Sequence, residues 1–153
     1  MEENKKEGRY SRIHNQLSEL VLKSNSSSAR MATIIAVLHH KMDYFFWTGF
    51  YLIEKGEMTV NIYQGPVACQ ILEKDKGACW AAFNKMEAVI IEDVHNFPDH
   101  IACDSRSNSE IVIPFKNIEG EIIGVLDIDS SQKGSFSDVD AKWLESILEL
   151  VWI

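Results

Sequence analysis

Residues 122–129 read Ile-Ile-Gly-Val-Leu-Asp-Ile-Asp and predict a β-strand with two carboxylates on one face. Side chains alternate between the faces of a strand, so Leu126 and Ile128 share one face and Asp127 and Asp129 share the other. The pair could be a solvated strand end. Buried like charges, in contrast, must be paired, protonated or bound to a cation. The segment therefore predicts either a solvated end or a site for a substrate ammonium, a proton transfer or, less readily, a metal, since calcium and magnesium need more oxygen ligands.

The segments around this strand predict an α+β fold. Apolar and β-branched runs predict further strands at 45–53, 58–64, 88–91 and 110–115. Apolar residues at helical spacing, or a cap before them, predict helices over 13–21, 31–42, 76–85 and after Ser137. The order of helices, antiparallel strands, an irregular middle, strands and a last helix favours an antiparallel sheet with helices packed on one face.

The composition is typical of one soluble globular domain. The chain has 153 residues, 46% of them hydrophobic, which suffices for a single core. Its net charge of -8 argues against nucleic acid and anionic membranes as partners, because both bind basic surfaces. No apolar run is long enough for a membrane helix. Residues 1–8 are charged and no apolar stretch follows them, so we expect a flexible tail, a domain over residues 9–153, no signal peptide and a cytoplasmic location.

The three cysteines form an odd set that excludes a closed disulfide framework. In a cytoplasmic protein such residues more often indicate redox chemistry, catalysis, metal binding or burial. Their spacing matches neither a CxxC motif nor a zinc motif. Cys69 lies in a loop, and Cys79 lies at a predicted helix start, where the helix dipole favours a thiolate unless the residue is simply buried.

Cys103 lies in the polar stretch 92–108, which has no apolar period. A long irregular stretch in a compact domain is usually functional or mobile. An imidazolium at His95 or His100 would lower the pKa of the Cys103 thiol, and the neighbouring Asp104 would oppose that effect. A reactive thiol and an ordinary free thiol both remain open for Cys103 on these residues alone.

Residues 47–52 place Trp47, Gly49 and Tyr51 on one face of the first predicted strand. A glycine between two aromatic residues can leave a notch for an apolar ligand group. More often it marks a bulge or a close backbone approach within a core.

Six segments of the chain occur together in a known enzyme family. They are Trp47–Leu52, Tyr63–Cys69, Asp93–Pro98, His100–Ser105, Ser109–Pro114 and Gly124–Ser130. With few gaps between Trp47 and Trp143, the chain closely resembles the free methionine-(R)-sulfoxide reductases, which are GAF-domain enzymes. The resemblance implies a single GAF domain with a central antiparallel sheet flanked by helices, in a homodimer.

The resemblance also implies roles for particular residues. Cys103 matches the attacking cysteine and Cys69 the resolving one, while Cys79 matches a third cysteine that is an alternative resolving thiol or structural. Carboxylates that hold the substrate and the sulfoxide are matched by Glu110, Asp127 and Asp129, and aromatic positions around the methyl group by Trp47 and Tyr51. One departure affects Cys79: the family usually has glycine after this cysteine, and here the residue is Trp80.

The implied reaction reduces free L-methionine-(R)-sulfoxide to methionine through a sulfenic acid and a disulfide. Thioredoxin is the expected external reductant, and neither a cofactor nor a metal is expected. The alternative is a non-catalytic GAF module that senses a ligand or the redox state. A sensor would not need cysteines in its loops, and it would usually be fused to an output domain.

Overall fold

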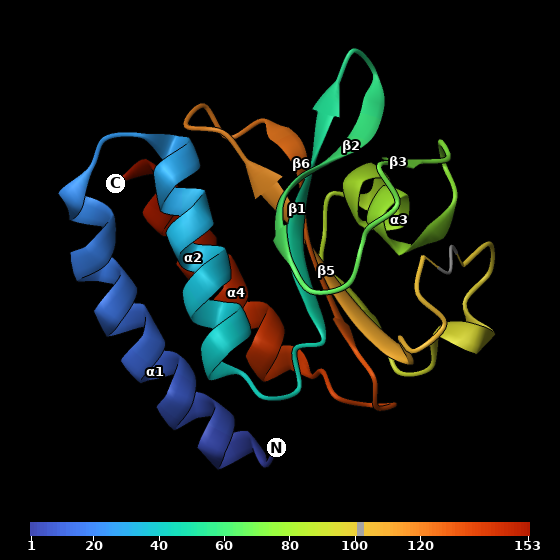
Figure 1. The fold of residues 1–153 in the computed structure, drawn as a ribbon, viewed down its shortest axis with the longest axis horizontal. Coiled ribbons are helices and arrows are strands. Elements are labelled where there is room, and N and C mark those ends of the chain that lie inside the picture. Colours follow the sequence, from blue (N-terminus) through green and yellow to red (C-terminus); the bar gives the residue numbers. More distant parts are fainter. Residues whose placement is uncertain (101–102) are drawn as a thin grey trace.

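The computed structural model describes residues 1–100 and 103–153, and its centre is a six-stranded antiparallel sheet (Figure 1). The strand order is β3-β2-β1-β6-β5-β4. The strands are β1 Trp47–Glu54, β2 Glu57–Gln64, β3 Ile71–Leu72, β4 Val89–Ile91, β5 Ser109–Lys116 and β6 Ile122–Ser130. The predicted strands are therefore confirmed within a few residues at each end, and the α+β class with them.

Three helices cover one face of the sheet. They are α1 Glu3–Leu20, α2 Ser27–Lys41 and α4 Asp138–Glu149. Between them and the sheet lies a core to which β1, β5 and β6 contribute Phe50, Phe115, Leu126 and Ile128, all fully or almost fully buried. At Ser137, the predicted N-cap forms a capping box with Asp140 and starts α4.

The opposite face is covered by α3 Gly77–Lys85 and by the loops beside it (Figure 1). The prediction that all helices pack on one face is therefore wrong for α3. The segment is short and has few apolar residues, so their spacing identifies a helix without showing which face of the sheet the helix covers. The carboxylate-bearing face of β6 lies beneath this helix, which contacts β4, β5 and β6.

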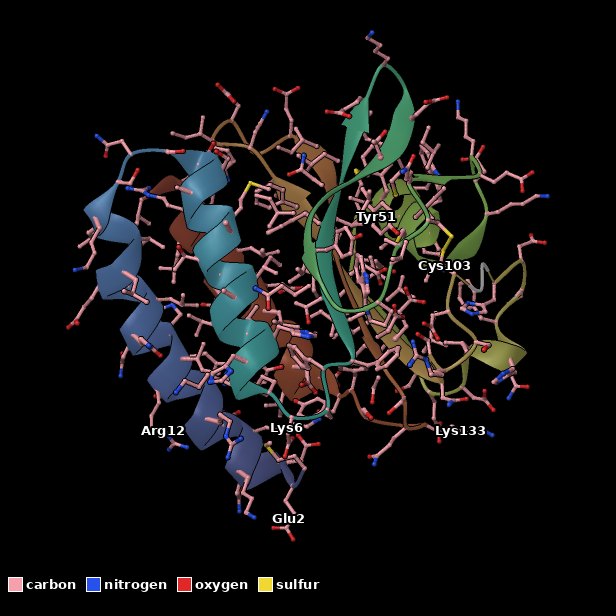
Figure 2. The ribbon with its side chains drawn as sticks, viewed as in Figure 1. Glu2, Lys6, Arg12, Tyr51, Cys103 and Lys133 are labelled. Atoms are coloured by element: carbon pink, nitrogen blue, oxygen red, sulfur yellow. A yellow bond between two sulfur atoms is a disulfide. The ribbon has the colours of Figure 1, made fainter. Side chains whose placement is uncertain are left out.

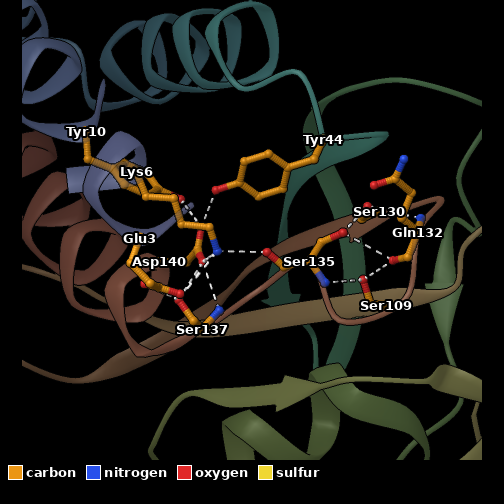
Figure 3. Close-up of polar contacts among 10 residues, drawn as sticks. All are labelled: Glu3, Lys6, Tyr10, Tyr44, Ser109, Ser130, Gln132, Ser135, Ser137 and Asp140. Atoms are coloured by element: carbon orange, nitrogen blue, oxygen red, sulfur yellow. Dashed lines mark hydrogen bonds and ion pairs between the residues drawn. The ribbon is translucent and has the colours of Figure 1, made fainter. Parts of the chain in front are cut away.

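The expected flexible tail over residues 1–8 is also wrong, because α1 begins at Glu3. Lys6 is only 2% exposed and its ammonium lies 2.5 Å from a carboxylate oxygen of Asp140 (Figure 3). Asp140 also accepts hydrogen bonds from the hydroxyls of Tyr10 and Tyr44. The charged N-terminal segment thus joins α1 to the start of α4. No helix in the described part of the chain has the length and apolar character needed to cross a membrane.

Candidate active site

Three carboxylates lie on the face of the sheet that α3 covers. Asp127 and Asp129 alternate along β6, and Glu110 on β5 is the register partner of Asp129. Glu110 and Asp127 are each only 6% exposed. The interpretation of the β6 pair as a solvated strand end is therefore wrong for Asp127, which is buried, while Asp129 is half-buried.

Burial changes the acidity of this cluster. It raises the pKa of Glu110 well above its ordinary value, and the neighbouring charges of Asp127 and Asp129 raise it further. The pKa of Asp129 is likewise raised well above its ordinary value, by burial first and then by the charges of Asp127 and Asp104. Closely spaced buried carboxyls cannot all ionise, so this cluster retains protons that an exposed carboxyl would lose.

Cys79 faces these carboxylates from the first turn of α3. Its sulfur and the carboxylates of Glu110 and Asp127 provide three atoms that all lie within 4.8 Å of one another. Cys79 is 4% exposed, and burial followed by the charge of Asp127 raises the pKa of its thiol well above the ordinary value. Burial outweighs the helix dipole here, so Cys79 is a protonated thiol rather than a thiolate.

Cys69 and Cys103 form a disulfide that joins the β2–β3 loop to the loop before β5 (Figure 2). The two residues are 34 positions apart in sequence, and their Cα atoms are 5.5 Å apart. Cys103 is exposed and Cys69 is half-buried, so an external thiol can approach this bond from solvent. Within the described residues, Cys79 is the one free cysteine.

Trp47 and Tyr51 fix the loop that carries Cys69. The Trp47 indole Nε1 donates to the Pro66 carbonyl at 3.0 Å, and the Tyr51 hydroxyl donates to the Cys69 carbonyl at 3.1 Å. Their rings stack with centroids 5.7 Å apart and line the pocket beside the carboxylates. The two aromatic residues thus orient the loop through their polar atoms while presenting apolar ring surface to the pocket.

The notch that was one alternative at Gly49 is filled. A Cβ built on Gly49 would lie 2.4 Å from the Tyr63 Cβ and 2.6 Å from Cη2 of Trp47. Glycine is therefore required so that the Trp47 ring can fold over the strand. The interpretation of Gly49 as part of a packed core is therefore correct, and the β1–β2 register also shifts between Gly49 and Tyr51, as at a bulge.

The two histidines near Cys103 have different surroundings. His100 lines the pocket, and burial followed by the charge of His95 lowers its pKa below the ordinary value. His100 is therefore neutral at pH 7 and does not act as the imidazolium that would lower the pKa of a nearby thiol. His95 is exposed and contacts the carboxylate of Asp93 at 2.9 Å.

Asp104, the other charge beside Cys103, is paired with Arg106. Their closest side-chain atoms are 2.7 Å apart, and hydrogen bonds from Arg106 lower the pKa of Asp104 to about 2. The guanidinium also lies 4.9 Å from the ring centroid of Phe46, another pocket residue. Arg106 therefore offsets the negative charge that would oppose ionisation of the Cys103 thiol.

The carboxylates, Cys79, Cys103, the two aromatic residues and His100 line one small pocket of about 50 Å³. Seven of the eight predicted site residues line it, and the eighth, Cys69, is bonded to Cys103. The predicted set is Trp47, Tyr51, Cys69, Cys79, Cys103, Glu110, Asp127 and Asp129.

Sequence reasoning missed several residues that line the same pocket. They include Phe46, Lys76, Gly77, Ala78 and Ser107. No side chain among the described residues caps the first turn of α3, so its backbone N–H groups give this side of the pocket a positive potential, while the Lys76 ammonium is paired with Glu73 at 3.1 Å. The only signal in the sequence is the position of Lys76 directly before a predicted helix.

Trp80, the departure from the family pattern, lies on α3, and its side chain points toward β3. Its side chain is 4% exposed, its Nε1 donates to the Leu72 carbonyl at 3.3 Å, and its ring meets Phe83 edge-on. The larger residue thus fills the space between α3 and β3. Cys79 still reaches the pocket beside it.

Comparison with known proteins gives consistent matches over most of the chain. A family model described as GAF domain matches residues 28–153. "GAF domain-containing protein A" of Dictyostelium discoideum is 41% identical over 95% of this chain and 92% of its own length. The free methionine-R-sulfoxide reductase of Escherichia coli is 37% identical over 91% of this chain and 84% of its own length. Among solved structures, the free methionine-R-sulfoxide reductase of Neisseria meningitidis in complex with its substrate is 36% identical, with a TM-score of 0.87 over 93% of this chain and 85% of that chain.

Proposed function

The chain belongs to the free methionine-R-sulfoxide reductases, oxidoreductases with a GAF domain, and we propose that it reduces free L-methionine-(R)-sulfoxide to methionine through a cysteine nucleophile. One observation carries the mechanism. The Cys69–Cys103 disulfide lies at a pocket lined by three carboxylates, two of them buried. An oxidisable thiol pair beside acids that retain protons is what reduction of a sulfoxide requires.

In the first step, Cys103 acts as the nucleophile and the carboxyl cluster as the acid. A sulfoxide oxygen is a poor leaving group until it is protonated, and a carboxyl with a raised pKa can donate that proton at neutral pH. Glu110 is the member that we assign as this acid, because it is buried and its pKa is raised both by burial and by the neighbouring charges. The Cys103 thiolate attacks the sulfoxide sulfur, the oxygen passes to Cys103, and methionine leaves with Cys103 as a sulfenic acid.

In the second step, Cys69 resolves the sulfenic acid. Its thiol attacks the Cys103 sulfur, one water leaves, and the disulfide forms. The Cα distance of 5.5 Å between the two residues suits this bond. Two electrons from an external dithiol then restore both thiols by exchange. We propose thioredoxin as that dithiol, with no bound cofactor, and the exposed Cys103 supports such access.

Cys79 has a different part in this proposal. It is buried in the pocket and its thiol stays protonated, whereas a resolving cysteine must reach the sulfenic acid as a nucleophile. We assign Cys79 to the pocket lining, against Glu110 and Asp127, rather than to resolution. Variants with Cys79→Ser should therefore still form the Cys69–Cys103 disulfide, as peptide mapping under non-reducing conditions would detect.

Specificity for the free amino acid follows from the charges on the pocket walls. The ammonium group of the substrate would face Asp127 and Asp129, and its carboxylate would face Lys76 and the first turn of α3. The methyl group would lie against Trp47 and Tyr51. A methionine sulfoxide within a peptide has neither a free ammonium nor a free carboxylate, so the charged groups on the pocket walls would be left without partners. Burying those groups unpaired would cost several kcal/mol, of the order of the penalty for unpaired polar groups.

A coupled assay with a thioredoxin system tests the proposal. Wild-type protein should consume free methionine-(R)-sulfoxide, and it should leave the S epimer and a peptide sulfoxide unreacted. Cys103→Ser should be inactive, while Cys69→Ser should release one methionine per chain and then stop. A fully reduced wild-type protein that forms the disulfide with peroxide but consumes no sulfoxide would instead indicate a redox sensor.

Two further expectations concern the assembly and its location. We propose a homodimer and a cytoplasmic protein, both on the strength of the family resemblance. Light scattering coupled to size-exclusion chromatography would measure twice the chain mass of 17.4 kDa for the dimer. A mass of one chain over the working concentration range would contradict it.

A further inference from the structure

The pocket holds a set of side chains whose chemistry differs from that of a carboxylate site alone. Cys79 on α3, Glu110 on β5 and Asp127 on β6 each bring one sulfur or oxygen atom to within 4.8 Å of the other two. All three side chains are buried and all three line the pocket. Three separate elements thus converge on one point with one thiol and two carboxylates.

One atom in this cluster lacks a partner. Oδ1 of Asp127 is buried and has no hydrogen-bond partner among the described residues. The residue as a whole is only 6% exposed. A buried acceptor without a partner costs about 1–3 kcal/mol, and more if it is charged. No hydrogen bond among the described residues reaches this oxygen, although the Cys79 thiol and the Glu110 carboxyl lie near enough to turn toward it, so a cation bound at this point would also satisfy the acceptor.

The donor set discriminates between cations. A thiolate with two carboxylates suits zinc and similar borderline metals, whereas magnesium and calcium prefer sites made of oxygen. Bonds of about 2.0–2.3 Å in a tetrahedral site place ligand atoms roughly 3.3–3.8 Å apart. Ligand atoms that are already within 4.8 Å of one another reach these spacings with side-chain movements of about 1 Å.

We propose that Cys79, Glu110 and Asp127 form a binding site for a borderline divalent cation such as Zn²⁺, and that the bound cation excludes the substrate from the pocket. The fourth position is open to water from the pocket. Binding forms one metal–sulfur bond and metal–oxygen bonds to the two carboxylates, releases the Cys79 thiol proton and the proton held by the Glu110 carboxyl to solvent, and transfers no electrons. The exclusion of substrate rests on the proposed function, because it assumes that the substrate occupies this pocket. The metal site itself does not.

The disulfide form of the protein isolates this site for measurement. With Cys69 and Cys103 bonded to each other, Cys79 is the one thiol that remains, and a thiol count on the denatured protein verifies this. Co²⁺ serves as the probe, because a thiolate ligand produces a charge-transfer band in the near ultraviolet. Zn²⁺ should displace Co²⁺ with one equivalent per chain, and Mg²⁺ should leave the band unchanged.

Cys79→Ser is the decisive variant, and Glu87→Gln is its matched control because Glu87 is an exposed carboxylate outside the pocket. Cys79→Ser should lose the charge-transfer band and bind Zn²⁺ at least tenfold more weakly, with circular dichroism confirming the fold. Glu87→Gln should bind like wild type. Absence of the band in the wild-type protein, an unchanged band in Cys79→Ser, or displacement by Mg²⁺ would overturn the site.

The exclusion of substrate is tested in Cys69→Ser/Cys103→Ser, which keeps only the Cys79 thiol and cannot react. Free methionine-(R)-sulfoxide should displace Co²⁺ from this variant, and the intensity of the charge-transfer band should fall as the sulfoxide concentration rises. A band that persists at saturating substrate would overturn the exclusion. Failure of the proposed function would be visible separately, as absence of turnover by metal-free wild-type protein.

Discussion

Glu110 shows how position sets the chemistry of a single residue. The family resemblance implies that it is a substrate-binding carboxylate, but the sequence does not show how deeply the side chain is buried. The alternation along residues 122–129 correctly places Asp127 and Asp129 on one face and leaves their exposure open. Exposure depends on α3, whose side of the sheet is a tertiary property that no local pattern encodes.

Replacement of this carboxyl by its neutral isostere should separate stability from activity. Because the pKa of Glu110 is raised in the folded protein, its stabilising effect is complete below its ordinary value of 4.5 and is lost as the pH rises through the folded pKa. Glu110→Gln cannot ionise, so the variant does not lose this stability as the pH rises. The variant should gain on the order of 1 kcal/mol of unfolding free energy, relative to wild type, between pH 5 and pH 8, and it should lose reductase activity at both.

Denaturant unfolding at the two pH values measures the stability difference. The matched control is Glu119→Gln, which alters an exposed carboxylate in the β5–β6 turn and should change stability by no more than about 0.5 kcal/mol. An equal stability change at pH 5 and pH 8 for Glu110→Gln would show that the carboxyl is not held protonated by its surroundings.

At the scale of elements, the loop that carries Cys69 depends on Gly65. Its φ is +121°, and a Cβ there would lie 2.8 Å from the Phe46 carbonyl oxygen and 3.0 Å from the Trp47 ring. Gly65→Ala should therefore destabilise the fold by about 1–3 kcal/mol and displace the loop. Formation of the Cys69–Cys103 disulfide after addition of one equivalent of sulfoxide should become several-fold slower.

Gly120→Ala is the control for backbone strain without a clash. Gly120 also has a positive φ, of +86°, but apart from its chain neighbours no atom of the described residues lies within 4 Å of the position that an added methyl group would take. It should cost about 1–2 kcal/mol and leave the rate of disulfide formation unchanged. The rates are measured as the loss of free thiols over time. Equal rates for the Gly65 and Gly120 variants would contradict a role of Gly65 in positioning Cys69.

The elements also mark where prediction from sequence succeeds. Strands such as 122–129 and the capped helix after Ser137 have strong local patterns, and both are confirmed. The residues of the two cysteine loops have no such pattern, because their conformation depends on contacts with Trp47, Tyr51 and β5. The pairing of Cys69 with Cys103 is therefore implied by family resemblance and not by spacing.

For the molecule as a whole, the N-terminal segment is part of the folded domain. The charged composition of residues 1–8 predicts a tail, yet Lys6 is buried against Asp140 and also donates to the Ser135 carbonyl at 2.8 Å. A buried ion pair between residues 134 positions apart leaves no trace in local composition. The contact ties the first helix to the last.

Removal of one partner from this pair should unfold the protein far more easily than removal of a neighbouring charge. Lys6→Ala leaves Asp140 buried without its counter-ion and should cost about 3–5 kcal/mol. Lys5→Ala changes an exposed residue and should cost no more than about 0.5 kcal/mol. Urea unfolding measures both, and similar values for the two variants would refute the assignment of α1 to the domain.

The proposed reaction is tested most directly by one turnover without a reductant. Fully reduced protein is mixed with excess free methionine-(R)-sulfoxide, and methionine, free thiols and linked peptides are quantified. The mechanism predicts one methionine per chain, loss of two thiols, a Cys69–Cys103 bond and a free Cys79. Release of no methionine by the reduced wild-type protein, or a disulfide that includes Cys79, would contradict it.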